Sequence, residues 1–574
     1  MGRLCIRNGT VFDPIHQVDG QVMDIWIENG KIIPKPDDGV ASRVIDATGR
    51  IVMAGGIDMH AHIAGPKVNI ARKLRPEDRR SGGFSERSAI RRSGTLGSTP
   101  STFTTGYLYA GMGYTTVFDA AIPPLGARHT HEEFHDTPMI DKGFFVLIGN
   151  NHYAMQQIAK GESQRLQDFA GWLLNATRGY ALKVVNPGGV ENWKAGHTAH
   201  DTGLDTPVSG FDLTPRAIIS AIAQVANDLK LPHPMHLHCN RLGLPGNVAT
   251  TLDTMRTIDG RRAHLTHIQF HSYGGDPNDQ ATFCSGVTQL ADYVNAHPEM
   301  TVDVGQVMFG ETTSMTGDGP LGYYLHQVLG RKWFNGDTEL EAGCGIVPIT
   351  YRDKSFVHAL QWAIGLEWYL LVKNPWQIAL STDHPNGAAF LAYPEIMHLL
   401  MRRDYRREVI ARLPKKLRER CQLAELDREY SLYEIAIITR ASPARMLGLP
   451  HKGHLGIGAD ADVTIYQPND NLTLMFEMPV LLLKGGEIVV EHGELRQEIF
   501  GQTLVTEPSY DPEAIPAIRD WLESAYTIQF ANYSVDDHYL PQGRVTVPCE
   551  GGLPRPAPAA TLAIDGTPAA PDTP

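Results

Sequence analysis

Residues 50–65 read RIVMAGGIDMHAHIAG, a short apolar run that closes on His60 and His62. Successive side chains of a β-strand point to opposite faces, so two histidines one residue apart lie on the same face. Histidine is also a frequent ligand of metal ions. The stretch therefore predicts either a pair of metal ligands at the end of a buried strand or two solvated histidines at its mouth, and the spacing alone leaves both open.

The same stretch divides two kinds of sequence. Before it, β-prone runs such as LCIRNGTVFD and DIWIENGKII alternate with Asn-Gly turns, which is the pattern of small antiparallel strands. After it, as far as residue 440, apolar runs such as YTTVFDAAI alternate with segments of helical periodicity such as TPRAIISAIAQVANDLK. Buried strands that alternate with helices form parallel βα units, so we predict an α/β fold with a closed (β/α)8 barrel of the TIM type.

The two ends of the chain are expected to form a second domain. After residue 440, short strands and turns return in GADADVTIY and PVLLLKGGEIVVEHGEL, so both chain ends should meet in one small β-sandwich domain. The final stretch, PRPAPAATLAIDGTPAAPDTP, is rich in Pro and Ala and is predicted to be disordered. The predicted division is residues 1–52 and 441–510 for the β domain, 53–440 for the barrel and 511–574 for a C-terminal extension.

The composition of the 574-residue chain restricts its partners. A net charge of −13 provides no positive field for nucleic acid or for an anionic membrane surface. Six cysteines without a CxxC pair suit a reducing compartment, and no apolar stretch approaches the length of a membrane span. We therefore expect a cytoplasmic protein that binds neither nucleic acid nor membrane.

Lys183 lies in the middle of the apolar run GYALKVVNPGG. An isolated buried ammonium is costly, so a buried lysine is ion-paired, lowered in pKa or chemically modified. One interpretation is an ion-paired lysine whose stem packs in the core. The other is a neutral amine that adds carbon dioxide and becomes a carbamate, an anionic oxygen ligand able to bridge two metal ions.

The stretch HPMHLHCNRLGLPGN places two histidines at another strand end. His236 and His238 share one face of the strand, and His238 lies nearer its carboxyl end, which makes it the better candidate for a ligand. His236 is expected deeper, behind the ligands. Cys239 points to the opposite face and is expected to be a core residue.

Two later strand ends also carry candidate ligands. RRAHLTHIQFHSYGG offers three histidines whose spacing does not choose among them, namely His264, His267 and His271. QIALSTDHPNG closes on Asp383 and His384. An aspartate in that position either binds a metal ion or caps the next helix.

The order of these candidates, each on its own βα unit, resembles that of the amidohydrolase superfamily, as do GGIDMHAH and ASPARMLGLPHKGHLGIGADADVTIY. The resemblance implies two Zn²⁺ ions bridged by carboxylated Lys183 and a hydroxide. It also selects His267 among its neighbours and makes Asp383 the catalytic base and then acid. The metal ligands that it implies are His60, His62, Lys183, His238, His267 and Asp383.

Longer motifs narrow the resemblance. GGIDMHAHIAGPKVNIARKLRPEDRR, KVVNPGG, HLHCNRLGLPGN, THIQFHSYGG and STDHPNG are similar to the A-subunit family of formylmethanofuran dehydrogenases and bacterial formyltransferase/hydrolase complexes. This implies hydrolysis of the formamide bond of formyl-methanofuran, or of a methylofuran-type analogue, to formate and the carrier amine, in a complex of several subunits in one-carbon metabolism. The alternative is the reverse condensation of formate with the amine. The Ala/Pro-rich tail suits a high-GC bacterial genome and favours hydrolysis.

The carriers of this family bear several carboxylates, which guanidinium groups bind through two parallel hydrogen bonds. The loop after the first barrel strand holds a basic cluster that either binds the carrier or is a solvated loop face: Arg72, Lys73, Arg75, Arg79 and Arg80. Asn186, Asn240 and His384 are predicted to orient the substrate beside the metal ions.

Two other functions stay open. A cyclic-amide hydrolase of the dihydropyrimidinase or dihydroorotase type shares the ligand order, although the long loop of residues 64–107 and the motifs around Asn186 and Asn240 speak against it. A scaffold protein without activity would be expected to have lost ligands, whereas all six positions are filled.

Overall fold

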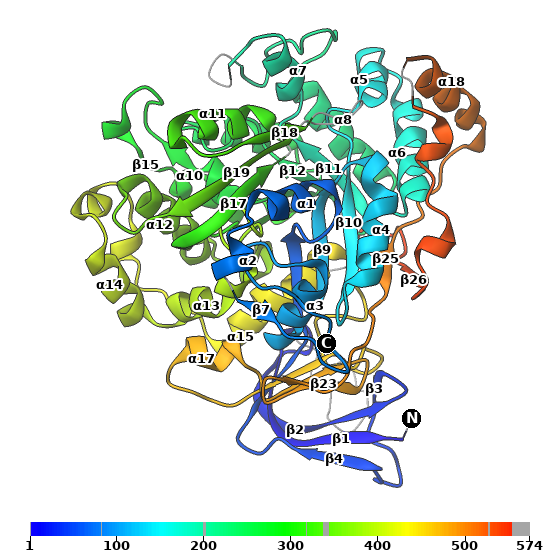
Figure 1. Cartoon of the computed structure of the whole chain (residues 1–574), viewed down its shortest axis with the longest axis vertical. Helices are drawn as coiled ribbons and strands as arrows, with labels where there is room; N and C mark the ends of the chain where they lie inside the picture. The colour runs from blue at the N-terminus through cyan, green and yellow to red at the C-terminus, as the bar shows by residue number, and fades with distance from the viewer. Residues whose placement is uncertain are drawn as a thin grey trace, which may run out of the picture.

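The computed structural model describes residues 2–81, 83–198, 202–316, 318–336, 344–525 and 528–553. The tail that was predicted to be disordered, residues 554–574, lies outside the described residues. A barrel of parallel strands surrounded by helices stands above a smaller β-sheet in the view of Figure 1.

Eight parallel strands form the barrel, and each pairs with the next one along the chain. A bridge between Ala61 and His384, with a hydrogen bond of 2.8 Å from the amide of His62 to the carbonyl of His384, closes it between the first and the last strand. The carboxyl ends of all eight strands therefore meet at one rim. The strands are β6 (Gly56–Ala61), β9 (Tyr114–Ile122), β10 (Asp141–Leu147), β11 (Ala181–Val185), β12 (Met235–His238), β13 (Ala263–Leu265), β16 (Met300–Asp303) and β20 (Ile378–Ala379).

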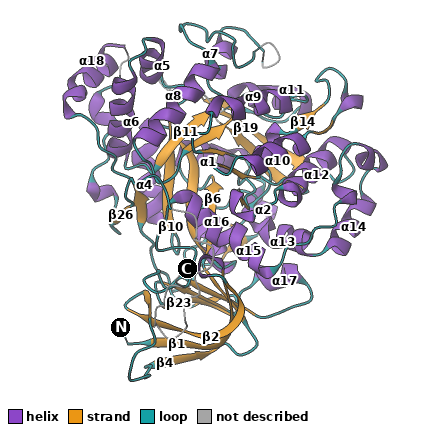
Figure 2. Cartoon of the chain, turned by 180° about the vertical axis from the view of Figure 1, so that it is seen from behind, coloured by secondary structure: helices purple, strands orange, loops and turns teal. Residues whose placement is uncertain are grey.

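The sequence pattern accounts for these elements. All nine residues of β9 are buried, as expected of a parallel strand covered on both faces. Helix α8 (Pro215–Asp228) begins as its sequence predicts: the hydroxyl of Thr214 accepts the amide of Ala217, and Pro215 lies in the first turn. Ile218 and Ile222 of this helix are buried. The helices around the barrel are α3 (Thr102–Gly111), α4 (Ala127–Asp136), α5 (His152–Ala159), α6 (Ser163–Thr177), α8 (Pro215–Asp228), α9 (Val248–Ile258), α10 (Val287–Ala296), α12 (Phe356–Leu371), α13 (Tyr393–Met401), α14 (Arg403–Arg412), α15 (Leu432–Ala436) and α16 (Ser442–Leu447) (Figure 2).

Both chain ends form the β domain, as predicted, in the form of one nine-stranded mixed sheet. The two ends join where β5 and β21 pair in antiparallel fashion. A short helix, α17 (Leu472–Glu477), packs from this domain against α13. The strands are β1 (Leu4–Asp13), β2 (Val18–Glu28), β3 (Lys31–Ile33), β4 (Arg43–Asp46), β5 (Ile51–Ala54), β21 (Val463–Tyr466), β22 (Leu481–Lys484), β23 (Glu487–Glu491) and β24 (Glu494–Leu495).

The chain then returns to the barrel. Thr503 of β25 (Thr503–Val505) pairs with Lys142 of β10, and β26 (Arg544–Thr546) pairs with β25 in turn. Helix α18 (Ile515–Ala525) lies between them in sequence. The stretch before residue 510 thus contributes to both sheets, and the three predicted boundaries, after residues 52, 440 and 510, stay predictions. None of the helices in the described segments combines the length and apolar character that crossing a bilayer requires.

A further layer covers the rim of the barrel. Strand β17 pairs with β19, which also pairs with β18, and helices α1 and α11 pack against this small sheet (Figure 1). Its elements are α1 (Gly65–Leu74), α2 (Asp78–Ser81), α7 (Gly189–Lys194), β17 (Gly310–Thr316), α11 (Gly319–Leu329), β18 (Phe334–Gly336) and β19 (Cys344–Tyr351).

A buried ion cluster joins the barrel to the β domain. Asp141, at the start of β10, accepts hydrogen bonds from the ammonium groups of Lys452 and Lys484. The carboxylate of Asp462 lies 2.8 Å from Lys484 and 3.3 Å from Lys452. All four side chains are less than 10% exposed, so the charges compensate one another away from water.

We expect Asp141→Asn to lower the free energy of unfolding by about 3–5 kcal/mol, because it removes one partner of a buried charge cluster. The temperature and urea midpoints of unfolding measure the effect. The matched control is Asp136→Asn, whose carboxylate pairs with Arg92 on the surface and should contribute less than about 1 kcal/mol. Equal midpoints for the two variants would mean that the cluster does not stabilise the fold.

Candidate metal centre

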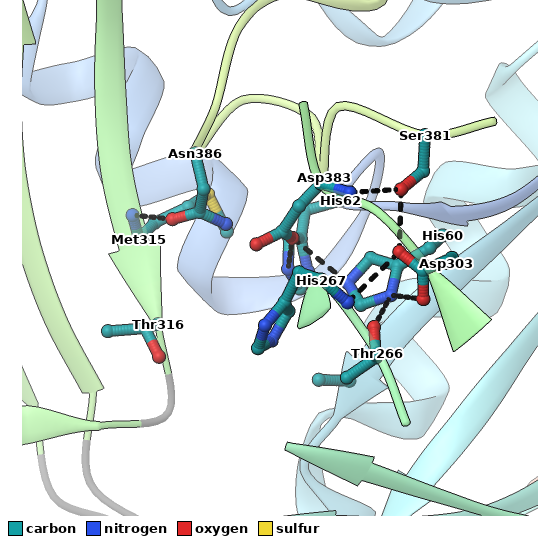
Figure 3. Close-up of polar contacts among 12 residues, drawn as sticks. His60, His62, Thr266, His267, Asp303, Met315, Thr316, Ser381, Asp383 and Asn386 are labelled. Carbon is teal, nitrogen blue, oxygen red and sulfur yellow. Dashed lines mark hydrogen bonds and ion pairs between the residues drawn. The ribbon is translucent and has the colours of Figure 1, made fainter. Parts of the chain in front are cut away.

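The first group of candidate ligands lies where β6 and β20 end. His60 and His62 are buried, and their Nε2 atoms lie 2.9 and 3.3 Å from Oδ1 of Asp383 (Figure 3). The three ligand atoms lie within 4.8 Å of one another. Although burial alone would raise it, His60 and His267 hold the pKa of the Asp383 carboxyl well below its ordinary value. An ionised carboxylate between two imidazoles suits Zn²⁺, which takes nitrogen and oxygen ligands.

The second group lies at the ends of β12 and β13. His238, His267 and His271 are buried, and their ligand nitrogens also lie within 4.8 Å of one another. Nε2 of His238, Nδ1 of His267 and both ring nitrogens of His271 have no hydrogen-bond partner in the part of the chain that the structure describes. Buried polar atoms are normally paired, so several unpaired lone pairs in one place fit a second metal ion.

Lys183 lies in β11, in register with His236 of β12. Its side chain is 2% exposed, and among the described residues it forms no hydrogen bond or close ion pair; Asp383 and Asp303 attract it only from a distance. Burial lowers the pKa of the Lys183 ammonium to about 7, against the attraction of Asp383 and Asp303. A large share of neutral amine is therefore present near pH 7, which is the form that adds carbon dioxide.

A chain of buried histidines stands behind His60. The carbonyl of Met446 accepts Nδ1–H of His233 at 2.8 Å, Nε2 of His233 accepts Nδ1–H of His236 at 2.9 Å, and Nε2 of His236 accepts Nδ1–H of His60 at 3.0 Å. The backbone carbonyl fixes this direction, since it can only accept. His60 therefore presents Nε2 to Asp383, and Nε2 is the nitrogen that would bind a metal ion. His236, as predicted, lies deeper, with its ring nitrogens already paired.

Asp303, at the end of β16, completes the support of His60. Its Oδ1 lies 3.2 Å from Nδ1 of His60 and 3.0 Å from Nε2 of His264, and its Oδ2 accepts the hydroxyl of Ser381 at 2.6 Å and the amide of His267 at 3.1 Å. His60, His236 and Asp303 lie close enough to hold an ion themselves, but hydrogen bonds already join their facing atoms. In the metal-free protein burial disfavours charge on His60, yet Asp303 and Asp383 outweigh it and raise its pKa to about 9. Metal binding at Nε2 thus displaces a proton.

Asp119, in the second half of β9, stands behind His62. Its Oδ1 lies 3.6 Å from Nδ1 of His62, and its Oδ2 accepts the amides of Ile63 at 2.8 Å and Ala64 at 3.0 Å. Burial alone would raise the pKa of Asp119, but His62 and these amides lower it. The carboxylate thus fixes the turn that follows β6 and stands beside the His62 ring.

Sequence reasoning missed Asp119 and Asp303. Asp303 closes a buried strand in MTVDV, which is the same signal that identified Asp383, whereas Asp119 lies inside the buried run YTTVFDAAI. His233 carried no signal of its own, because its role depends on how strands pack. Cys239 is fully buried in the hydrophobic core, as expected.

The structure brings two of the three predicted orienting residues together. The amide of Asn240 donates to Oδ1 of Asn186 at 3.0 Å and to the carbonyl of Pro187 at 2.9 Å, while Oδ1 of Asn240 has no partner among the described residues. The backbone carbonyl of His384 accepts the amide of His62 where the barrel closes, and its ring nitrogen Nδ1 accepts the amide of Phe390 at 3.3 Å. Asn186 and Asn240 thus form a bonded pair of which Asn186 lines a cavity, and an orienting role for the three residues stays a prediction.

The basic cluster is not gathered around the candidate ligands. Arg72 donates to the carbonyls of Pro100 at 2.8 Å and Ile63 at 3.0 Å, which holds the long loop against the end of β6. Arg75 is buried and donates to Asp78 at 3.0 Å and to the carbonyl of Thr312 at 3.1 Å. Lys73, Arg79 and Arg80 are exposed. Binding of a carrier by this cluster stays a prediction.

Two cavities lead to the site. One of about 380 Å³ is lined by Asn186, Trp193, Arg241 and Asp318. Another of about 80 Å³ reaches His267 and Asp383. Both are lined by Leu242, Leu321 and Tyr324, so they adjoin beneath α11. A substrate can therefore be held at the rim with its reactive end beside the candidate ligands.

Asp318 stands between the larger cavity and the second group of histidines. Its Oδ2 lies 3.7 Å from Nε2 of His238, and its Oδ1 accepts the amide of Leu321 at the start of α11. Burial raises the pKa of the Asp318 carboxyl to about 6.

Comparisons with known proteins agree with this geometry. A family model described as the amidohydrolase family matches residues 43–490. The chain is 44% identical over 563 residues to the protein FwdA of Methanocaldococcus jannaschii, covering 94% of this chain and 98% of that protein. It is 38% identical over 551 residues to the A-subunit of the formyltransferase/hydrolase complex Fhc of Methylorubrum extorquens, covering 94% and 98%.

The fold is similar to a chain in the crystal structure of that formyltransferase/hydrolase complex, FhcABCD from Methylorubrum extorquens, in complex with methylofuran. The TM-score is 0.90 at 37% identity, and the match covers 95% of this chain and 100% of the other. The likeness therefore extends over the barrel, the β domain and the segments that cover the rim.

Proposed function

This chain belongs to the amidohydrolase family, and from that premise we propose that it hydrolyses the formamide bond of a formylated furfurylamine carrier of the methanofuran or methylofuran type. The products are formate and the carrier amine. The chain acts in the cytoplasm as one component of a formyltransferase/hydrolase complex in one-carbon metabolism.

One observation carries the proposal. The chain matches the A-subunit of the Fhc complex over 94% of its length in sequence, and it is similar in fold to a chain of that complex. The similar fold includes the rim of the barrel, where the two groups of candidate ligands lie. A scaffold protein would not need buried, unpaired imidazole nitrogens. A cyclic-amide hydrolase would have no need to resemble the A-subunit of the Fhc complex in the segments that cover the rim.

The proposed centre is binuclear. His60, His62 and Asp383 would hold one zinc ion, His238 and His267 the other, and carboxylated Lys183 would provide an oxygen to each. The ions, when bound, would lower the pKa of a water molecule toward neutrality and polarise the formyl oxygen.

Asp383 moves the proton in this proposal. The oxygen of water bonds to the formyl carbon, Asp383 accepts the water proton, and the carboxyl then donates that proton to the nitrogen as the C–N bond breaks. The amine needs this proton, because an amide anion is a poor leaving group. In the metal-free protein His60 and His267 keep the Asp383 carboxyl ionised, and the ionised form is the one that can accept a proton.

Asn240 is proposed to orient the formamide. Its unpaired Oδ1 can accept the N–H of the substrate, while its amide is held by Asn186 and Pro187. Removal of the hydrogen-bond partner of a buried group costs about 1–3 kcal/mol, so this acceptor favours an N–H substrate over a tertiary amide.

Formate release from the formylated carrier, measured with the chain purified together with its partner proteins, tests the proposal. We expect turnover that is lost after removal of metal by a chelator and restored by Zn²⁺. Turnover of hydantoin or dihydrouracil instead would support the cyclic-amide alternative. No turnover of either kind, with well under one zinc per chain, would support a scaffold role.

The same groups can catalyse the reverse condensation, since a catalyst accelerates both directions. The partner proteins distinguish the two. Copurification of a formyltransferase without an active molybdopterin or tungstopterin protein supports hydrolysis, whereas the presence of such a protein supports fixation of carbon dioxide into the carrier.

A further inference from the structure

We propose that His271 is a third histidine ligand of the second metal subsite, beside His238 and His267. The inference rests on the proposed metal-dependent function and adds a residue to it. It makes the two subsites chemically different: one with two imidazoles and an aspartate, the other with three imidazoles.

The position of His271 follows from the turn after β13. His267 has a positive φ of 34°, and a 3-10 turn, η3 (Ile268–His271), follows it. The turn brings the His271 ring back onto that of His267, with centroids 5.4 Å apart and an angle of 26° between the planes. The ring of His238 lies 5.3 Å from His271. The three ligand nitrogens lie within 4.8 Å of one another, as expected of a shared ion.

The hydrogen bonds of the neighbouring histidines single out His271. His236 is bonded through both ring nitrogens, and so is His264, to Thr301 and Asp303. His271 is fully buried, and neither of its nitrogens has a hydrogen-bond partner among the described residues. A buried imidazole left unpaired has lost the hydrogen bonds that water would give it, and a bound metal ion would compensate that loss.

Direct contact with substrate does not explain His271. The cavity that reaches His267 and Asp383 is lined by Phe270 but not by His271, and the larger cavity does not reach His271 either. What the ring faces is the pair of imidazoles of His238 and His267. A third nitrogen donor also favours Zn²⁺ over harder ions such as Mg²⁺ or Mn²⁺ in this subsite.

His271→Phe tests the proposal, because it keeps a ring of similar size in the stack and removes both nitrogens. We expect the metal-free variant to be at least as stable as the metal-free wild type, since no hydrogen bond is lost. With Zn²⁺ bound, we expect the wild type to be the more stable of the two, because zinc raises the Tm of the variant by less than it raises the Tm of the wild type. In a chelator competition, we expect the dissociation constant of one of the two zinc ions to rise by about 100-fold or more. Loss of a residue that only hydrogen-bonds to a ligand already weakens metal binding by about 10–100-fold, and loss of a ligand should weaken it further.

The matched control is His131→Phe, which changes a buried histidine in α4 that bonds to the carbonyl of Thr177, away from the centre. We expect this control to bind two zinc ions per chain with wild-type affinity. His271→Ala provides a second variant in case the larger ring disturbs folding. Added imidazole should restore its second zinc ion if a nitrogen is what the subsite needs.

The outcomes separate this inference from the proposed function. Two zinc ions with wild-type affinity in His271→Phe, or no effect of imidazole on His271→Ala, would show that His271 is not a ligand while the function stands. A wild-type chain that binds no zinc at all would overturn both. Metal content and Tm, rather than turnover, give these answers.

Discussion

Asp383→Asn is expected to lower the rate of formate release by about 10²–10⁴-fold, the contribution of a positioned general acid and base. The asparagine carbonyl oxygen still reaches the nitrogens of His60 and His62, which lie 2.9 and 3.3 Å from the native oxygen. Zinc content should therefore stay close to that of the wild type, while proton transfer is lost. Stopped assays of formate together with metal analysis of the same preparation measure both quantities.

The control for this variant is Asp279→Asn, which changes an exposed aspartate that accepts the amide of Ala281 at a short turn, where asparagine can do the same. It should release formate at the wild-type rate. A wild-type rate in Asp383→Asn would remove Asp383 from the mechanism. A slow rate with equally reduced zinc would mean that the residue is a ligand and not the group that moves the proton.

The strand ends explain why much of the site was predictable. His60, His62, Lys183, His238 and Asp383 each lie on or just after a buried run, and a barrel brings the carboxyl ends of all its strands to one rim. Chain order and the period of the strand then suffice to place them together. The structure gathers the candidate ligands in two groups of three ligand atoms, a distinction that the order did not contain: His60, His62 and Asp383 in one group, and His238, His267 and His271 in the other.

The residues that were missed depend on tertiary contacts. No spacing in the sequence relates Asp303 to His60, 243 positions away, or His233 to the carbonyl of Met446. Arg72 was predicted from its charge either to bind the carrier or to belong to a solvated loop face, and nothing in the sequence indicated its bonds to the carbonyls of Ile63 and Pro100. Such bonds form only when residues 64–107 fold back on β6, which local propensity does not predict.

Lys183→Ala is expected to have the largest effect of all, because it removes an oxygen ligand from both proposed zinc ions at once. We expect zinc content to fall from two toward zero or one per chain, and formate release to fall below detection. Unlike most truncations of buried residues, this one should not greatly destabilise the metal-free fold. The lysine has no bonding partner among the described residues, and its buried ammonium is itself unfavourable, as its pKa of about 7 indicates.

A small carboxylate tests what the lost side chain contributes. If the active form of Lys183 is a carbamate, then acetate or propionate has the same pair of oxygens and can occupy the space left by the shortened side chain, so part of the zinc content and of the turnover should return. Methylamine is the matched addition, since it supplies an amine and no carboxylate. Recovery with methylamine alone would indicate that the free amine is the active form. Recovery with the carboxylate alone would indicate that the protein depends on carbon dioxide for its ligand.

The same dependence predicts that metal-free wild-type chain regains zinc faster in bicarbonate buffer than in buffer stripped of carbon dioxide.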